Sequence, residues 1–218
     1  IKRLTGRMTA INLEPAIIKK EEEKSVWNLT EGRRATVENA RKAADMGVDM
    51  IILTGNPGVG VDNEAIIQAL SKLKEAVGDR VILTAGKMHA SGIISEAGEN
   101  ILTEKDVEAF LEAGADVILL PAPGTVPGIT MEYAGKLIKK AHEKGALAMT
   151  TIGTSQEGAD EETIRQIALM CKMAGADIHH IGDSGYMGMA LPENITSYSV
   201  AIRGKRHTYR RMAMSLLR

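Results

Sequence analysis

The chain has 218 residues, of which 44% are hydrophobic and 25% are charged, and its formal net charge is -1 at pH 7. These values are typical of an ordinary globular protein with a single domain, here residues 1–218. They exclude an overall field that would attract nucleic acid or an anionic membrane, and no apolar run approaches the roughly 18 residues of a membrane helix. We find no signal peptide and one cysteine, so we expect a cytoplasmic protein.

Apolar runs that alternate with helix-like stretches predict six βα units. The predicted strands are residues 9–13, 50–54, 81–85, 117–121, 146–151 and 178–181. A glycine follows each of five helix-like stretches, where a positive φ ends a helix: Gly47, Gly78, Gly114, Gly145 and Gly175. Parallel strands need a crossover connection, so a strand-helix repeat of about 30 residues favours an all-parallel sheet. Thr103 and Thr130 are predicted N-caps of two of the helices.

The number of units leaves two architectures to consider. An open doubly wound sheet is complete with five or six strands, whereas a closed barrel takes eight βα units and about 250 residues. The G-x-D strand opening recurs at every second unit, as at 114–116 and 175–177, which suits the alternate-strand layers of a barrel. We therefore predict a TIM (β/α)8 barrel of which this chain carries six units, with the two N-terminal units missing. Its open sheet edges lead us to expect a homo-oligomer.

The carboxyl ends of the predicted strands carry the candidate functional residues, because sites in parallel α/β folds lie there. All six strand ends run into polar or glycine-rich loops, and Asn12 and Asn56 are candidate ligand-binding residues in two of them. The strand beginnings instead repeat an aspartate, at Asp49, Asp116 and Asp177, which we assign to stability.

The run G-D-S-G-Y-M-G at 182–188 predicts an anion-binding loop. Backbone N–H groups of Gly182, Ser184 and Gly185 would face a phosphate or carboxylate at a helix N-terminus. The preceding loop supplies two hydroxyl donors, Thr154 and Ser155. The alternative is that the glycines only turn the chain.

Lys87 is the first candidate catalytic residue, because it follows an apolar strand by one glycine. It can form a Schiff base or clamp an anion, whereas the plain alternative is a strand-end lysine in solvent. His89 lies two residues after Lys87, so we expect it on the same side of the strand, and it is a candidate proton carrier. Glu14 and Asp183 are candidate metal or acid-base carboxylates at the ends of strands far apart in the sequence.

The remaining motifs do not predict a cofactor site, and two histidines and the cysteine have plain structural interpretations. No local ligand spacing such as H-x-x-x-H predicts a metal, so none is assigned, although a divalent ion stays open. The loop at 55–60 departs from the dinucleotide pattern because Pro57 intrudes. His179 and His180 are adjacent on a strand, so at most one of them can face a barrel lumen. Cys171 lies among apolar helix residues and is predicted to be buried and inert.

The chain resembles an uncharacterised bacterial (β/α)8-barrel family whose members are often labelled phosphoenolpyruvate phosphonomutase-like or hydrolase-like. The matching motifs include N-L-E-P at 12–15, G-K-M-H at 86–89, L-L-P-A-P-G-T-V-P-G at 119–128, T-I-G-T-S-Q-E-G at 151–158 and H-I-G-D-S-G at 180–185. The resemblance covers essentially the whole chain and implies a barrel with about two more N-terminal units. It does not supply a reaction.

Two functional hypotheses follow. The first is a barrel enzyme with lyase or isomerase chemistry on a small phosphorylated or carboxylated metabolite. The second is a non-catalytic barrel that binds a sugar phosphate or a protein partner in a regulatory role.

Overall fold

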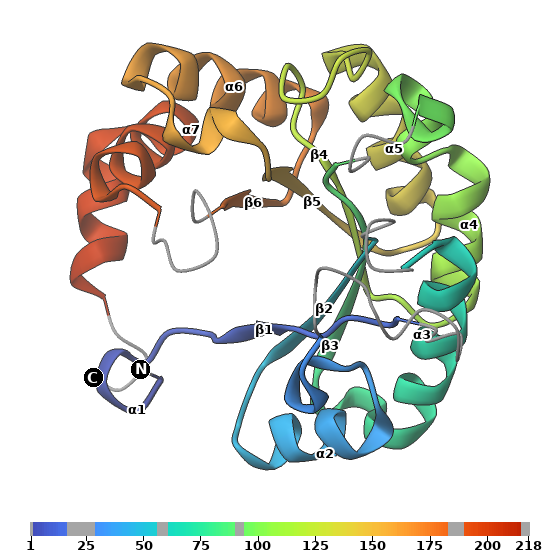
Figure 1. The fold of residues 1–218 in the computed structure, drawn as a ribbon. Helices are drawn as coiled ribbons and strands as arrows, with labels where there is room; N and C mark the ends of the chain where they lie inside the picture. Colours follow the sequence, from blue (N-terminus) through green and yellow to red (C-terminus); the bar gives the residue numbers. More distant parts are fainter. Residues whose placement is uncertain (1, 17–28, 56–60, 90–93, 183–189, 215–218) are drawn as a thin grey trace.

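A single curled parallel sheet forms the centre of the molecule in the computed structural model (Figure 1), which describes residues 2–16, 29–55, 61–89, 94–182 and 190–214. The sheet order is β1-β2-β3-β4-β5-β6, and every neighbouring pair is parallel. The described strands are β1 (Ala10–Asn12), β2 (Met50–Gly55), β3 (Ile82–Lys87), β4 (Val117–Pro121), β5 (Leu147–Ile152) and β6 (Ile178–Ile181). All six predicted strands are therefore confirmed, as is the incomplete barrel that they form.

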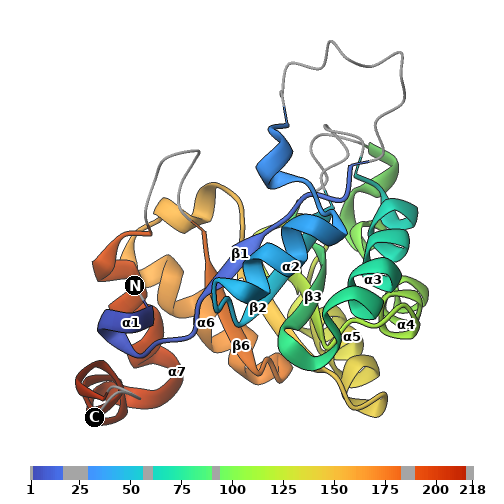
Figure 2. The same ribbon diagram turned by 90° about the horizontal axis from the view of Figure 1, so that it is seen from below.

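Helices alternate with the strands and cover the outer face of the curled sheet (Figures 1 and 2). The α-helices are α1 (Lys2–Thr5), α2 (Val37–Asp45), α3 (Asn63–Val77), α4 (Glu104–Glu112), α5 (Met131–Glu143), α6 (Glu161–Ala174) and α7 (Pro192–Ala213). Short 3-10 helices are η1 (Glu31–Arg33), η3 (Gly78–Arg80), η4 (Ile94–Glu96), η5 (Gly98–Ile101) and η6 (Ser155–Gly158). No helix in the described ranges is both long and apolar enough to cross a membrane.

The predicted helix ends are confirmed at atomic level. Thr103 forms a capping box with Asp106, and the Thr130 hydroxyl accepts from the Tyr133 N–H at 3.1 Å. Gly175 ends α6 with a φ of 100°, a value that is costly for residues with a Cβ. The other four glycines of the repeat also have positive φ.

Side-chain alternation divides the sheet into two apolar layers. The outer layer packs on the helices and contains Leu83, Ala85 and Ile118. The inner layer consists of strand residues around Met50, Leu119 and Met149, with Met88 packed against them. These side chains fill the inner side of the sheet, as in the interior of a barrel.

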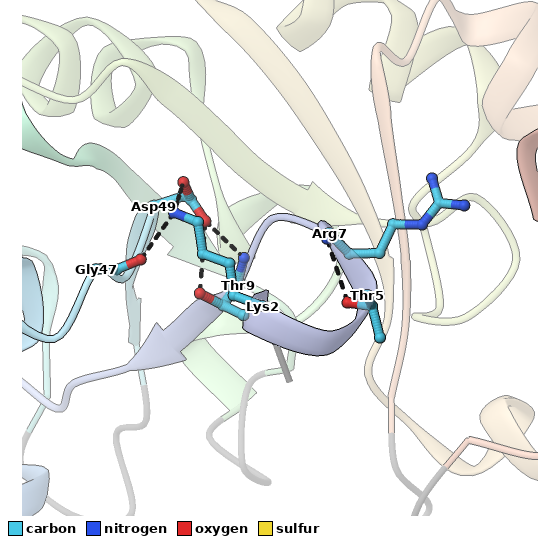
Figure 3. A network of polar contacts seen from close by, with 6 residues as sticks. All are labelled: Lys2, Thr5, Arg7, Thr9, Gly47 and Asp49. Carbon is cyan, nitrogen blue, oxygen red and sulfur yellow. Dashed lines mark hydrogen bonds and ion pairs between the residues drawn. The ribbon is translucent and has the colours of Figure 1, made fainter. Parts of the chain in front are cut away.

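Aspartates fasten alternate strands together at the amino ends of the sheet. Asp49, before β2, accepts from the Thr9 N–H at 2.8 Å and pairs with Lys2 at 2.6 Å (Figure 3). Asp116, before β4, accepts from Leu83 N–H, and Asp177, before β6, accepts from Ala148 N–H, both at 2.8 Å. We call this repeated arrangement of Asp49, Asp116 and Asp177 the aspartate latch. It explains why the G-x-D opening recurs at every second unit.

The open side of the sheet lies between β6 and β1, beside α7 and α1 (Figure 1). The Arg7 guanidinium donates to the Arg211 carbonyl, which ties the chain before β1 to the end of α7. Helix α7 is kinked at Gly204, whose φ is 77°. The basic segment 203–211 lies at and beyond this kink, and Thr208 is its buried residue.

Candidate active site

Lys87 is the last residue of β3, and only 2% of its surface is exposed, which makes it one of the largest fully buried side chains described. By alternation it belongs with Leu83 and Ala85 on the outer side of the strand. Its stem crosses Gly55, the paired residue on β2: a Cβ built on Gly55 would lie 2.6 Å from Lys87 Cγ. The absence of a side chain at Gly55 therefore makes room for the lysine.

His89 follows two residues later and is half-buried. Burial lowers the pKa of its imidazole below the usual 6.5, because the charged form loses hydration. A neutral imidazole near the end of β3 can accept a proton at neutral pH.

Glu14 is buried, and its carboxylate binds the Arg33 guanidinium. Its backbone also forms an isolated bridge with Arg34, and the Ala35 N–H donates to the Glu14 carbonyl at 3.0 Å. Glu14 thus holds the segment around η1 against the end of β1. Asn12 is exposed, and its side-chain oxygen accepts from the Thr54 hydroxyl at 3.2 Å.

The predicted hydroxyl donors lie after β5, at the start of η6. The Thr154 hydroxyl contacts the Gln156 side chain and donates to the Thr125 carbonyl at 3.3 Å, whereas Ser155 is exposed. The Gly182 N–H donates to the Ile152 carbonyl at 2.8 Å and is therefore engaged by β5. Four candidate site residues lie outside the described residues: Asn56, Asp183, Ser184 and Gly185.

Two groups at this end of the sheet were not predicted. The His180 ring faces the inner side of β6, where Nδ1 lies 2.6 Å from the buried Thr151 hydroxyl. The Glu157 carboxylate lies against Gly182: a Cβ built there would be 1.8 Å from Oε2. The alternation of I-H-H-I allowed one inward histidine but could not say which, because the register of β6 on β5 decides it.

His179 points the other way and contacts α7. Its Nδ1 lies 3.0 Å from the Tyr198 hydroxyl, with the two ring centroids 5.3 Å apart. Cys171 is buried in the same layer, as predicted, and burial raises the pKa of its thiol.

No group of three or more histidine, cysteine, aspartate or glutamate side chains within the described ranges could hold a metal ion. The carboxyl ends of the described strands and the loops after them carry the buried Lys87 amine, the His89 and His180 imidazoles, and the Glu14 and Glu157 carboxylates. These groups are suited to proton transfer and to binding a carbonyl or an anion.

Comparisons with known proteins agree with this architecture. Structures similar to the chain include a tetrameric deoxyribose phosphate aldolase from Aeropyrum pernix, with 17% identity, a TM-score of 0.63, and coverage of 93% of this chain and 74% of that one. A putative phosphonomutase from Burkholderia cenocepacia J2315 has 15% identity and a TM-score of 0.58, with coverage of 92% and 77%. At such identities the likeness establishes the barrel fold alone.

A family model described as "Domain of unknown function (DUF7916)" matches residues 1–218. No curated protein sequence matches the chain.

Proposed function

Because the chain belongs to DUF7916, a family of unknown function, we propose its activity from the site itself: a barrel enzyme with lyase or isomerase chemistry on a small phosphorylated or carboxylated metabolite. The buried Lys87 carries this proposal. Its amine stands at the carboxyl end of a barrel strand, the end at which barrel enzymes place their active sites, and the fold encloses it almost completely.

Lys87 has two proposed roles. As a nucleophile, the Lys87 amine attacks a substrate carbonyl carbon, a C=N bond forms as water leaves, and a proton from the proton carrier converts the imine into an iminium. The resulting iminium accepts the electron pair of the neighbouring bond that breaks. As a clamp, its ammonium holds a substrate carboxylate or phosphate in place.

The remaining candidates supply protons and anion contacts in this proposal. His89, neutral at pH 7, is the proton carrier, with Glu14 as the alternative when it is released from Arg33. Asp183, Ser184 and Gly185 stay proposed site residues of the loop after β6, together with Asn12, Asn56, Thr154, Ser155 and Gly182. A divalent metal stays an open addition to this set.

Borohydride trapping distinguishes the two roles of Lys87. The protein is incubated with a panel of phosphorylated and carboxylated aldehydes and ketones, reduced, and analysed by peptide mass spectrometry. An adduct on Lys87 supports the Schiff base; turnover without an adduct supports the clamp. The exposed Lys139 is the matched control lysine. Full activity of Lys87→Ala would exclude both roles.

Gly55→Ala provides a second variant that leaves the lysine in place. The new Cβ would meet the Lys87 stem at 2.6 Å, so the flexible side chain must move. We expect a fall in kcat of at least about tenfold, since small displacements of catalytic groups are costly. Gly32→Ala is the control, because nothing lies within 4 Å of its Cβ position.

A non-catalytic binding role is the second candidate. Two observations favour it, because both groups already have partners inside the fold. The Glu14 carboxylate pairs with Arg33, and the Gly182 N–H donates to the Ile152 carbonyl. Calorimetry against sugar phosphates, with a turnover assay on the same panel, separates the candidates. Binding without turnover supports the second.

Assembly into a homo-oligomer is also part of the proposal. In the described sheet, β1 and β6 each pair with one neighbour, and such edges invite pairing with another chain. Sedimentation equilibrium tests this, and a monomer at all concentrations would contradict it.

A further inference from the structure

A cavity of about 190 Å³ lies between β6 and α7, on the open side of the sheet. Its lining residues are His179, His180, Ile181, Ile195, Tyr198, Ser199, Ile202 and Arg203. The volume corresponds to about six water molecules at roughly 30 Å³ each, which is the size of a small metabolite. Strands β4 and β5 separate it from Lys87 on β3.

The cavity follows from how α7 and β6 meet. The lining positions of α7 are 195, 198, 199, 202 and 203, a spacing of three and four residues that places them on one helix face. Strand β6 contributes three consecutive residues, whose side chains alternate between its two faces. Both faces reach the cavity because β6 is an edge strand of the described sheet.

The lining combines one permanent cation with apolar and neutral polar groups. Arg203 contributes a guanidinium, and the eight lining residues include neither aspartate nor glutamate. Burial, followed by the nearby charges of Arg203 and Lys172, lowers the pKa of His179, while Asp177 opposes the shift. The ring is therefore neutral at pH 7 and shares a hydrogen bond with Tyr198.

We propose that this cavity binds a small organic anion, with its carboxylate or phosphate on Arg203 and a short apolar body against Ile195 and Ile202. A guanidinium offers paired N–H donors that match the two oxygens of a carboxylate or phosphate. Ile195 and Ile202 lie one above the other on the α7 face and supply the apolar contact. The neutral His179 and the Ser199 hydroxyl supply uncharged polar groups.

Isothermal titration of the 218-residue protein tests the proposal with three probes: isovalerate, its neutral isostere isovaleramide, and inorganic phosphate. We expect isovalerate to bind at least about tenfold more tightly than isovaleramide, because the charge is required. Phosphate binding in place of isovalerate would assign the oxyanion to a phosphate ester instead of a carboxylate. Equal binding of isovalerate and isovaleramide would overturn the proposal.

Matched arginine variants locate the bound anion. Arg203→Gln should weaken binding of the anion at least about tenfold, whereas Arg206→Gln, on the same helix but outside the lining, should leave it unchanged. Both residues are exposed, so both variants should fold, which circular dichroism verifies. Equal losses in the two variants, or none in either, would overturn the assignment. Lys87→Ala should leave this binding unchanged, so the outcome is independent of the proposed enzyme activity.

Discussion

The two ends of the barrel strands differ in how their polar groups are used. At the amino ends three aspartates act alike, because each accepts an N–H from the preceding strand or from the residue just before it, and each pairs with a basic side chain, Lys2, Lys74 or His142. Among the residues that the structure describes at the carboxyl ends, the polar groups differ from strand to strand: a lysine is enclosed, a glutamate binds an arginine, and a histidine contacts a threonine. Regular polar groups mark the stabilising end, and irregular ones mark the end available for chemistry.

Gly86→Ala should give the largest effect, because it breaks the carboxyl end of β3 beside Lys87. A Cβ at this position would lie 1.7 Å from the Leu119 carbonyl oxygen, a backbone atom that cannot step aside. We expect a loss of more than about 3 kcal/mol in the free energy of unfolding, measured by urea denaturation. Gly32→Ala should stay within about 0.5 kcal/mol of the native protein. Equal stability of the two variants would contradict this close approach.

Asp116→Ala tests the amino end. The substitution leaves the part-buried Leu83 N–H without its 2.8 Å acceptor and removes the ion pair with Lys74. We expect a loss of about 1 to 3 kcal/mol in the free energy of unfolding. Asp79→Ala is the matched control, because Asp79 pairs with the same lysine but its side chain is 99% exposed. A comparable loss in both variants would mean that the latch acts through Lys74 alone.

The pH dependence of stability should separate the two ends. Burial lowers the pKa of His89 and His179 below 6.5, so below that pH the unfolded chain binds more protons than the folded protein. The free energy of unfolding should therefore fall as the pH drops below about 6.5. The hydrogen bond from Lys2 lowers the pKa of Asp49 below 3.8, so the stabilisation from Asp49 is present above 3.8 and lost at lower pH.

Histidine variants test this assignment by denaturation at several pH values. His89→Gln and His179→Gln should each reduce the pH dependence of the free energy of unfolding below pH 6.5. Asp49→Asn should reduce it only below about pH 3.8. If the slope of the free energy of unfolding against pH below 6.5 is unchanged in both histidine variants, the assignment to His89 and His179 is wrong.

Lys2→Ala should give the smallest effect, under about 1 kcal/mol, since the Lys2 side chain is 46% exposed and surface ion pairs contribute little. Asp49 still accepts from the Thr9 N–H in this variant. A double-mutant cycle with Asp49→Ala measures the coupling energy between Lys2 and Asp49. A coupling energy as large as the whole loss in Asp49→Ala would show that the cation, not the N–H, is the important partner.

The sequence by itself determined the six strands, the helix caps at Thr103 and Thr130, and the glycines that end the helices. These features depend on dihedral preferences and hydrogen bonds within a few residues, which the local pattern contains. The stabilising role of Asp49, Asp116 and Asp177 was also predictable, because their repeat places them before alternate strands.

Only the tertiary structure decided which groups meet at the carboxyl ends. Lys87 lies over Gly55, Glu14 binds Arg33, and His180 rather than His179 faces inward. The contacts of Lys87 and His180 depend on the register between strands, and a slip of one residue would reverse every side chain of a strand. That register is fixed by packing across the whole sheet, so no local stretch of the sequence contains it.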